Sequence, residues 1–386
     1  KWTDTAGVLS RRWDDRGYQQ QGHPGRQGCG DTRARGVAEH RGPPVYRRAV
    51  PVQCEAMGAI VPVSAIEEAA RRIEGVVRQT PLVELSLEPR TVFAKCENLQ
   101  ATGAFKIRGA YNFITQLTKD ECSRGVITYS SGNHGQAVAM AARLVGLPAV
   151  VVMPTTAPPI KVAGARALGA EVIFEGLTSA DRRTRAEAVA RDRGLHIVPP
   201  FDHPWIIAGQ GTVGLEILRD CPDVARVLVP VGGGGLISGI AAGVKQRRKD
   251  VRVVGVEPDG AAAMKASLAA GHPVTLDTVT SIADGLMPVR PGDQTFDHAR
   301  QFVDEIVTVS DDAIARAVLW LFRRAKLVVE ASGAATMAAI LDEEERGAGI
   351  GEGPTVVVLS GGNIALDTLA ALEAGDAARR QEAGGA

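Results

Sequence analysis

The feature that most constrains the fold is an alternation of short valine-rich runs with longer segments of helical pattern. The apolar runs occupy residues 126–129, 149–153, 171–174, 226–231, 251–256 and 355–359. The helical patterns occupy residues 133–145, 160–168, 180–191, 205–218, 236–249, 313–325, 333–341 and 364–372. Because runs without polar alternation are typical of strands buried on both faces, the order predicts parallel strands covered by helices. We therefore expect an α/β protein with two lobes of open, twisted, mostly parallel sheet and helices on both faces.

The turn-rich boundaries suggest how the chain divides into lobes. A Cys-Ser-Arg-Gly segment at residues 122–125 and a Pro-Pro pair at 199–200 bracket a predicted small domain, residues 122–203. Residues 57–121 and 204–374 are then expected to form the large domain, with residues 375–386 as a tail. Within the large domain, Ser64 and Glu67 have the spacing of a capping box and predict that a helix begins there.

Residues 1–56 differ from the rest of the chain in composition and in hydrophobic periodicity. They are rich in Arg, Gly, Gln and Pro and carry neither a helical nor a strand period, so we expect them to be disordered. An organelle transit peptide is an alternative. A further one, which we favour, is that Met57 is the natural start.

The composition excludes several classes of partner. Lys and Arg together number 44, as do Asp and Glu, so no net charge favours nucleic acid or an anionic membrane. No apolar run approaches the roughly 20 residues that cross a bilayer. The five cysteines are scattered, without Cys-x-x-Cys spacing, which predicts neither a zinc site nor a disulfide framework and favours a reducing cytoplasm.

One stretch carries the strongest chemical signal. Residues 97–110 follow an alternating apolar run at 91–96 and lead into a helical pattern at 107–117, with Lys106 between Phe105 and Ile107. A lysine in this setting could extend its ammonium to water. Alternatively, it could be desolvated, which lowers its pKa and frees the amine to attack carbonyls. The stretch alone leaves both readings open.

Three further strand-to-helix turns could meet Lys106, because ligands of open α/β sheets bind beyond the carboxyl ends of the strands. Residues 130–133 offer hydroxyls, backbone N–H groups and an amide where a helix begins, which suits a carboxylate but is also ordinary N-capping. Four consecutive glycines at 232–235 between a strand and a helix favour phosphate binding over a merely flexible turn. Ser360 ends a strand, where its hydroxyl could face a ligand, although such turns are common.

Taken together, these segments resemble the fold-type II pyridoxal-phosphate enzymes, and most closely the serine/threonine dehydratase and serine racemase group. The resemblance covers roughly residues 60–370 and rests on four segments in the family's order: residues 97–110, then Ser-Ser-Gly-Asn-His-Gly-Gln, Gly-Gly-Gly-Gly-Leu and Ser-Gly-Gly-Asn. It implies pyridoxal 5'-phosphate as cofactor, a small amino acid as substrate and a homo-oligomer, either dimer or tetramer.

The resemblance also implies the roles of individual residues. Lys106 would carry the cofactor covalently and act as general base, with Phe105 against the ring, Asn133 on its phenolic oxygen and Ser360 at its pyridine nitrogen. The phosphate would be held by the backbone of Gly232, Gly233, Gly234, Gly235 and Leu236. The substrate carboxylate would be held by Ser130, Ser131, Gly132, Asn133 and His134. The implied reaction eliminates water from L-threonine or L-serine, and hydrolysis of the resulting enamine releases ammonia and gives 2-oxobutyrate or pyruvate.

Departures from the family pattern keep alternatives open. Ser131 is a racemase-like residue that could act as acid or base on the face opposite Lys106, so a serine racemase or a 3-hydroxyaspartate ammonia-lyase is the alternative function. Glu257 matches one carboxylate of the racemase-like cation site, but Ala263 stands where a second is expected, so no metal is predicted. The regulatory extension of biosynthetic threonine dehydratases does not follow Asn363. A non-catalytic binding protein on the same fold is the most distant alternative.

Overall fold

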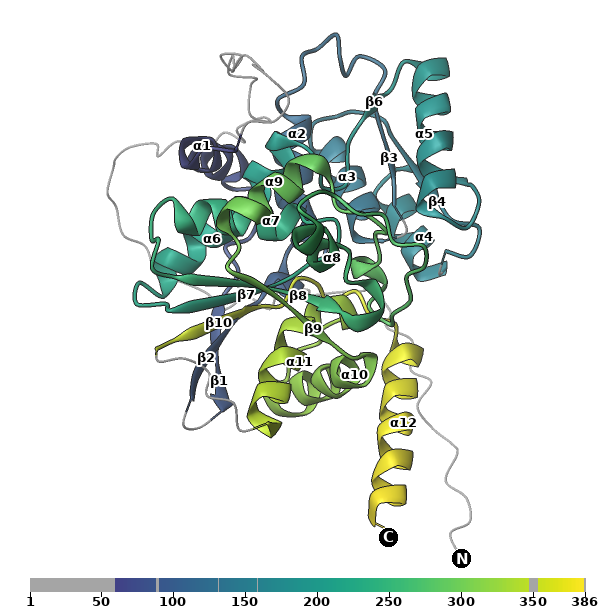
Figure 1. The fold of residues 1–386 in the computed structure, drawn as a ribbon. Helices are drawn as coiled ribbons and strands as arrows, with labels where there is room; N and C mark the ends of the chain where they lie inside the picture. Colours follow the sequence, from purple (N-terminus) through teal and green to yellow (C-terminus); the bar gives the residue numbers. More distant parts are fainter. Residues whose placement is uncertain (1–59, 88–89, 131, 158, 347–352, 385–386) are drawn as a thin grey trace, which may run out of the picture. The chain divides into compact units, whose positions relative to one another are not determined.

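Two β-sheets form the framework of the computed structural model, which describes residues 60–87, 90–130, 132–157, 159–346 and 353–384 (Figure 1). The larger sheet has the strand order β1-β2-β10-β7-β8-β9 and is parallel except for the antiparallel edge pair β1–β2. Its strands are β1 (Leu82–Leu87), β2 (Arg90–Lys95), β7 (Arg226–Pro230), β8 (Arg252–Pro258), β9 (Glu305–Val309) and β10 (Thr355–Val358). The predicted α/β class with mostly parallel strands is confirmed.

The smaller sheet is entirely parallel in the described residues, with the order β5-β4-β3-β6. Its strands are β3 (Val126–Tyr129), β4 (Ala149–Met153), β5 (Glu171–Phe174) and β6 (His196–Ile197). All four lie inside residues 122–203, the range predicted for the small domain. The described residues fall in one compact unit, so we retain the division at 122 and 203 as a proposal.

Helices cover both faces of the sheets, as expected for buried parallel strands (Figure 1). The helices are α1 (Val63–Ile73), α2 (Lys106–Ile114), α3 (Asn133–Leu144), α4 (Pro159–Ala167), α5 (Ser179–Arg193), α6 (Pro204–Asp220), α7 (Gly235–Lys245), α8 (Ala263–Ala270), α9 (Asp293–Phe302), α10 (Asp311–Trp320), α11 (Ala331–Glu345) and α12 (Leu366–Gly384). A π-helical turn, Leu321–Ala325, extends α10 and accounts for the longer helical pattern expected there.

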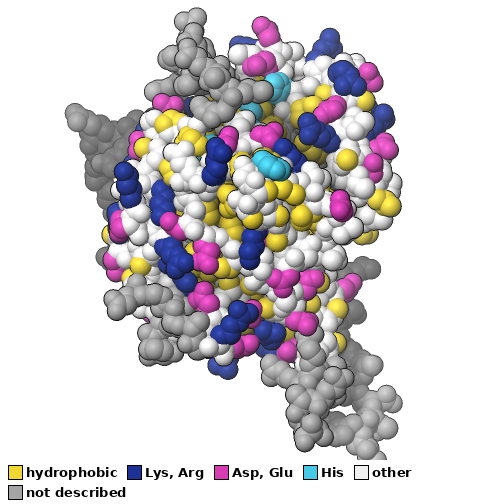
Figure 2. Space-filling view, in the orientation of Figure 1, with side chains coloured by type: hydrophobic (Ala, Val, Ile, Leu, Met, Phe, Trp, Pro, Cys, Tyr) yellow, Lys and Arg dark blue, Asp and Glu magenta, His cyan; other side chains and the backbone are white. Residues whose placement is uncertain are grey.

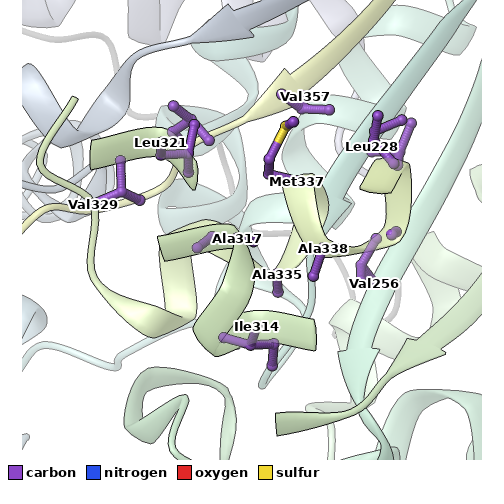
Figure 3. Close-up of a cluster of buried hydrophobic side chains, with 14 of the residues drawn as sticks. Leu228, Val256, Ile314, Ala317, Leu321, Val329, Ala335, Met337, Ala338 and Val357 are labelled. Atoms are coloured by element: carbon purple, nitrogen blue, oxygen red, sulfur yellow. The ribbon is translucent and has the colours of Figure 1, made fainter. Parts of the chain in front are cut away.

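Alternate residues of each central strand pack against opposite helix layers. In β7, Leu228 packs with Ile314 of α10 and Ala335 of α11 in one buried cluster (Figure 3). The neighbouring Val227 and Val229 belong to another cluster, with helices α6 and α7. In the smaller sheet, the same alternation places α2, α3 and α4 on one face and α5 on the other. The core therefore forms four helix-on-sheet interfaces, and the helix starts lie at the strands' carboxyl ends.

The predicted capping box at Ser64 is wrong. Helix α1 begins at Val63 with Pro62 at the N-cap, and no side chain of the helix caps it. Instead, Gln246 at the end of α7 accepts a hydrogen bond from Val63 N (3.0 Å) and donates one to Val61 O (2.9 Å). A residue 183 positions away thus satisfies the first amide of the helix, which local spacing could not reveal.

The surface is mixed in charge. On the face shown in Figure 2, basic and acidic side chains of the described residues are interspersed. None of the described helices is long and apolar enough to cross a membrane. The predictions for residues 1–56 and for Ser131 lie outside the described residues.

Candidate active site

Three neighbouring strands of the larger sheet end at the same edge. Strands β2, β10 and β7 are adjacent and parallel, so the segments that follow them lie side by side. These segments are Lys106 at the start of α2, Ser360 after β10, and residues 232–235, here called the glycine turn, after β7. Phe105 N donates to Ser360 O at 3.1 Å, which joins two of them directly. The structure thus brings together the turns that the sequence singled out in this sheet.

Lys106 is the first residue of α2, and its amine faces other protein groups. Nζ donates to the carbonyl of Pro200 at 2.9 Å and lies 5.1 Å from the centroid of the Phe105 ring. Although part of the side chain remains accessible, burial disfavours the charged amine and lowers the pKa of Lys106 to about 8. Of the two readings of this lysine, the structure favours the desolvated one.

Neighbouring residues pack closely against the glycine turn, and the backbone N–H groups of the turn are free in the described part of the chain. A Cβ on Gly233 would lie 2.4 Å from Cδ1 of Phe201, and Gly234 has a left-handed φ of 94°. Among the described residues, nothing accepts a hydrogen bond from the N–H groups of the turn, which leads into the first turn of α7. Leu236 is buried in that first turn. Phe201 follows Pro200, so the same short segment contacts both Lys106 and the glycine turn.

The start of α3, in the smaller sheet, supplies the next group of predicted residues. Ser130 follows β3, and its Oγ accepts from Gly132 N at 3.2 Å. Asn133 is the first residue of the helix, and the described residues offer no acceptor to its backbone N–H or to that of His134. Free amides at a helix start attract anions. Ser131 belongs to this loop but is outside the described residues, so its role stays a prediction.

His134 is buried and neutral. Its Nε2 lies 3.2 Å from Val198 O, so Nε2 carries the proton and donates it to the carbonyl. Burial, followed by the nearby Lys106, lowers the pKa of His134 to about 3. Its Nδ1 is buried without a partner among the described residues. His134 therefore brings an uncharged ring and a backbone amide to this loop rather than a positive charge.

Two residues of the site were not predicted. Glu330, immediately before α11, is 6 % exposed, and its Oε1 accepts from Asn133 Nδ2 at 2.6 Å. Asn363 donates from Nδ2 to Asn133 Oδ1 at 2.8 Å and to Thr102 O at 2.9 Å. The sequence signal for Glu330 is a single carboxylate within the apolar run 327–331, which could have marked it as unusual.

A further ion pair joins α4, which packs on the smaller sheet, to a loop next to the glycine turn. Lys161 of α4 contacts the carboxylate of Asp284, which lies in the loop that packs over Gly232. Nζ of Lys161 is also 3.4 Å from the position that a Cβ on Gly132 would occupy. The pair therefore joins the segment above the glycine turn to the loop that begins α3.

The residues present fit pyridoxal phosphate, the cofactor that the resemblance implies. Free amides at the glycine turn suit its phosphate, and an amine of lowered pKa suits its aldehyde. Asn133 has a second Nδ2–H available for an oxygen of the ring. Ser360 is a buried residue that lies just after β10, which places its hydroxyl where it can meet the ring nitrogen.

Glu257 has a structural role in this fold. It is fully buried, and its two carboxylate oxygens accept from Met264 N at 2.8 Å and Lys265 N at 2.9 Å, where α8 begins. Burial raises the pKa of Glu257 to about 7, although these two amide hydrogen bonds oppose the rise. The described residues contain no group of three or more His, Cys, Asp or Glu side chains arranged to hold a metal ion.

Comparisons with known proteins agree with this geometry. Residues 73–361 match the family described as "Pyridoxal-phosphate dependent enzyme". An L-threonine ammonia-lyase of Geobacter sulfurreducens is 43 % identical over 317 residues, which cover 80 % of this chain and 77 % of that protein. A solved threonine deaminase of T.th. is 40 % identical with a TM-score of 0.74, covering 79 % of this chain and 99 % of its own. Maize serine racemase is 37 % identical with a TM-score of 0.76, covering 81 % of this chain and 98 % of its own.

The matched family model spans well over half of the chain and includes each turn described above. The predicted enzyme class, cofactor and fold type are thereby confirmed, and the non-catalytic alternative falls away. The chain belongs to the pyridoxal-phosphate dependent enzymes, in their fold-type II branch.

Proposed function

We propose that the protein is an ammonia-lyase that converts L-threonine, L-serine or both to the 2-oxo acid and ammonia. The observation that carries the proposal is the position of the Lys106 amine, whose lowered pKa places a base beside the glycine turn and the start of α3. Relatives named L-threonine ammonia-lyase and threonine deaminase support the choice of substrate.

The proposed roles follow from the contacts. The glycine turn and Leu236 hold the cofactor phosphate through free backbone N–H groups, and Phe105 lies against the ring. Asn133 donates to the phenolic oxygen, and the Ser360 hydroxyl meets the pyridine nitrogen. Pyridoxal phosphate, when bound, supplies an electron sink that acidifies the Cα proton of the substrate.

Lys106 acts as the general base that takes this Cα proton. Because burial lowers the pKa of Lys106 to about 8, much more of the free amine is neutral near neutral pH than in an ordinary lysine. Burial thus provides a usable base near neutral pH without a second titrating residue.

The start of α3 holds the substrate carboxylate. The free backbone amides of Asn133 and His134, with the hydroxyls of Ser130 and Ser131, supply hydrogen-bond donors at the positive end of the helix, and the Gly132 amide holds Ser130 Oγ in place. Because His134 is neutral, the carboxylate is held by dipoles rather than by a formal charge.

The proposal is tested by incubating purified holoenzyme with L-threonine and with L-serine and measuring 2-oxo acid and ammonia. We expect equimolar release of both products from at least one substrate. Absence of 2-oxo acid from both amino acids, in protein that has bound the cofactor, would refute the proposed lyase function.

A racemase is the second candidate, because solved relatives named serine racemase share the fold at 36–37 % identity and the chain carries Ser131. Chiral chromatography of L-serine after incubation separates the two activities. Appearance of D-serine that is lost in Ser131→Ala would support the racemase, and unchanged enantiomeric purity excludes it.

Replacing Gly234 with alanine is expected to weaken cofactor binding at least about tenfold, because strain of order 1–3 kcal/mol accompanies a non-glycine residue at such a φ. A Cβ at Gly234 would also lie 2.7 Å from Cε of Met264 and 2.8 Å from Cβ of Thr295, which displaces the amides. The measurement is a titration of apoprotein with pyridoxal phosphate, followed by visible absorbance.

Gly146→Ala is the matched control for this prediction. Gly146 has a similar left-handed φ of 74°, but nothing lies within 4 Å of the position of its Cβ. This variant should lose some stability and keep the wild-type affinity for the cofactor. Equal affinities in Gly234→Ala and wild type would contradict the placement of the phosphate at the glycine turn.

We also propose a cytoplasmic homo-oligomer. The thiols of Cys96, Cys122 and Cys221 are free and buried, which suits a reducing compartment. The resemblance to the family supports a dimer or tetramer. Light scattering of the purified protein gives the mass, and a monomer at micromolar concentration would rule out this assembly.

A further inference from the structure

The position of Glu330 is fixed by contacts with Gly361 and with Asn133. Its backbone N–H donates to Gly361 O at 3.0 Å, and a Cβ on Gly361 would lie 2.2 Å from Glu330 Oε1. Any larger residue at 361 would therefore displace the carboxylate. The glycine in the segment after Ser360 is explained by the need to admit Glu330, and Glu330 is in turn held against Asn133 at 2.6 Å.

A chain of side-chain amides continues from this contact. Asn363 donates to Asn133 Oδ1, and Asn133 donates to Glu330, so the amide of Asn133 has one defined orientation. Asn363 is itself held tightly, because a Cβ on Gly103 would lie 2.3 Å from its Oδ1. In this orientation one Nδ2–H of Asn133 is used by Glu330, and one remains for a ligand oxygen.

No basic side chain among the described residues forms an ion pair with Glu330. The charged groups that face it are Asp284 and Lys161, which pair with each other, and its one side-chain donor is Asn133. Burial raises the pKa of Glu330 to about 7, and Asp284 adds to the rise, while Asn133 and Lys161 oppose it. The carboxyl group therefore gains or loses its proton near neutral pH, whereas His134 and His203, with pKa values of about 3 and 4, do not.

We propose that Glu330 is a positioning residue that acts on the bound cofactor through Asn133. By accepting from Nδ2, it fixes which hydrogen of the Asn133 amide meets the phenolic oxygen, and its own protonation changes the charge beside that oxygen. The proposal rests on the placement of Asn133 beside the cofactor, which is part of the proposed function, but it does not depend on which substrate is consumed.

The test is a pH titration of holoenzyme without substrate, from pH 5.5 to 9, followed by the absorbance and fluorescence of the bound cofactor. In wild type we expect a spectral transition with a midpoint of about 7. In Glu330→Gln, which keeps the shape of the side chain but cannot ionise, the transition should disappear. A transition caused by the cofactor's own phosphate would persist in this variant.

Glu257→Gln is the matched control, because Glu257 is also buried with a pKa raised to about 7 but bonds only to backbone amides of α8. This variant should retain the spectral transition even if its thermal stability changes. Should Glu330→Gln fail to fold, Glu330→Asp keeps the carboxylate while withdrawing it from Asn133. The midpoint of the spectral transition in Glu330→Asp should then move by about half a pH unit or more.

The two proposals fail in different ways. Wild-type holoenzyme without a transition near pH 7, or Glu330→Gln with an unchanged transition, would overturn the role of Glu330 and leave the lyase proposal standing. Normal spectra with no release of 2-oxo acid would overturn the lyase proposal and leave Glu330 in place.

Discussion

Replacing Lys106 with alanine is expected to lower kcat/KM for 2-oxo acid release from L-threonine by at least about a thousandfold. The change removes both the amine that carries the cofactor and the base that takes the Cα proton, and loss of a positioned general base alone typically costs 10²–10⁴-fold. The measurement is a steady-state assay of 2-oxo acid on protein reconstituted with pyridoxal phosphate.

Lys106→Arg sharpens this prediction. Arginine keeps a cation that can donate to Pro200 O, as Lys106 does at 2.9 Å, but a guanidinium does not lose its proton at neutral pH. We therefore expect it to be as inactive as the alanine variant, which separates basicity from charge. The exposed Lys119, changed to alanine, is the control and should keep wild-type activity. Activity within tenfold of wild type in either Lys106 variant would contradict the proposed base.

Replacing Arg108 with methionine is expected to destabilise the protein by about 3–5 kcal/mol, because it breaks a buried ion network by removing one partner. Arg108 is fully buried and contacts Glu97 at 2.7 Å and Glu216 at 2.6 Å. Glu216 also contacts the buried Lys95 at 2.6 Å. For a protein of this size the loss corresponds to roughly 4–6 °C in Tm, measured by calorimetry, and chemical denaturation gives the free energy directly.

The charges in this network depend on one another. Burial opposes the ionisation of both Glu97 and Arg108, yet their mutual attraction lowers the pKa of Glu97 and raises that of Arg108. Adding Glu97→Gln to Arg108→Met removes one of the carboxylates left unpaired. The double variant should therefore be more stable than the sum of the single effects predicts.

An exposed pair provides the control for Arg108. Arg183 and Glu187 contact at 2.8 Å within α5, with side chains 66 % and 39 % exposed. Arg183→Met should cost less than about 0.5 kcal/mol, because water screens such pairs. A loss of under 1 kcal/mol in Arg108→Met, close to that control, would show that the buried network does not stabilise the fold.

Since Arg108 lies in the first turn of α2, its loss should also lower activity by displacing Lys106.

Three strands of the smaller sheet were predictable because they are nearly continuous apolar runs, whereas the two-residue strand β6 was not predicted. The expected residues 126–129, 149–153 and 171–174 coincide with β3, β4 and β5. The edge strands of the larger sheet were not predicted. Strand β9 (Glu305–Val309) begins with an exposed glutamate and has a partner on one side only, so it needs fewer apolar residues and gives a weaker signal.

The candidate site was partly predictable for a topological reason. Turns after parallel strands meet at one sheet edge, so Lys106, the glycine turn and Ser360 could be grouped before any coordinates were known. The contact between Asn133 and Glu330 joins residues 197 positions apart, on elements of different sheets. Neither spacing nor periodicity encodes such a contact, and only the folded arrangement of α3 and α11 reveals it.

The attachment of the cofactor to Lys106 is tested most directly by reducing the holoenzyme with sodium borohydride and mapping its peptides by mass spectrometry. The geometry at the start of α2 predicts a single reduced cofactor adduct, on the peptide that carries Lys106. An adduct on any other lysine, or no adduct in protein that shows the cofactor's absorbance, would contradict it.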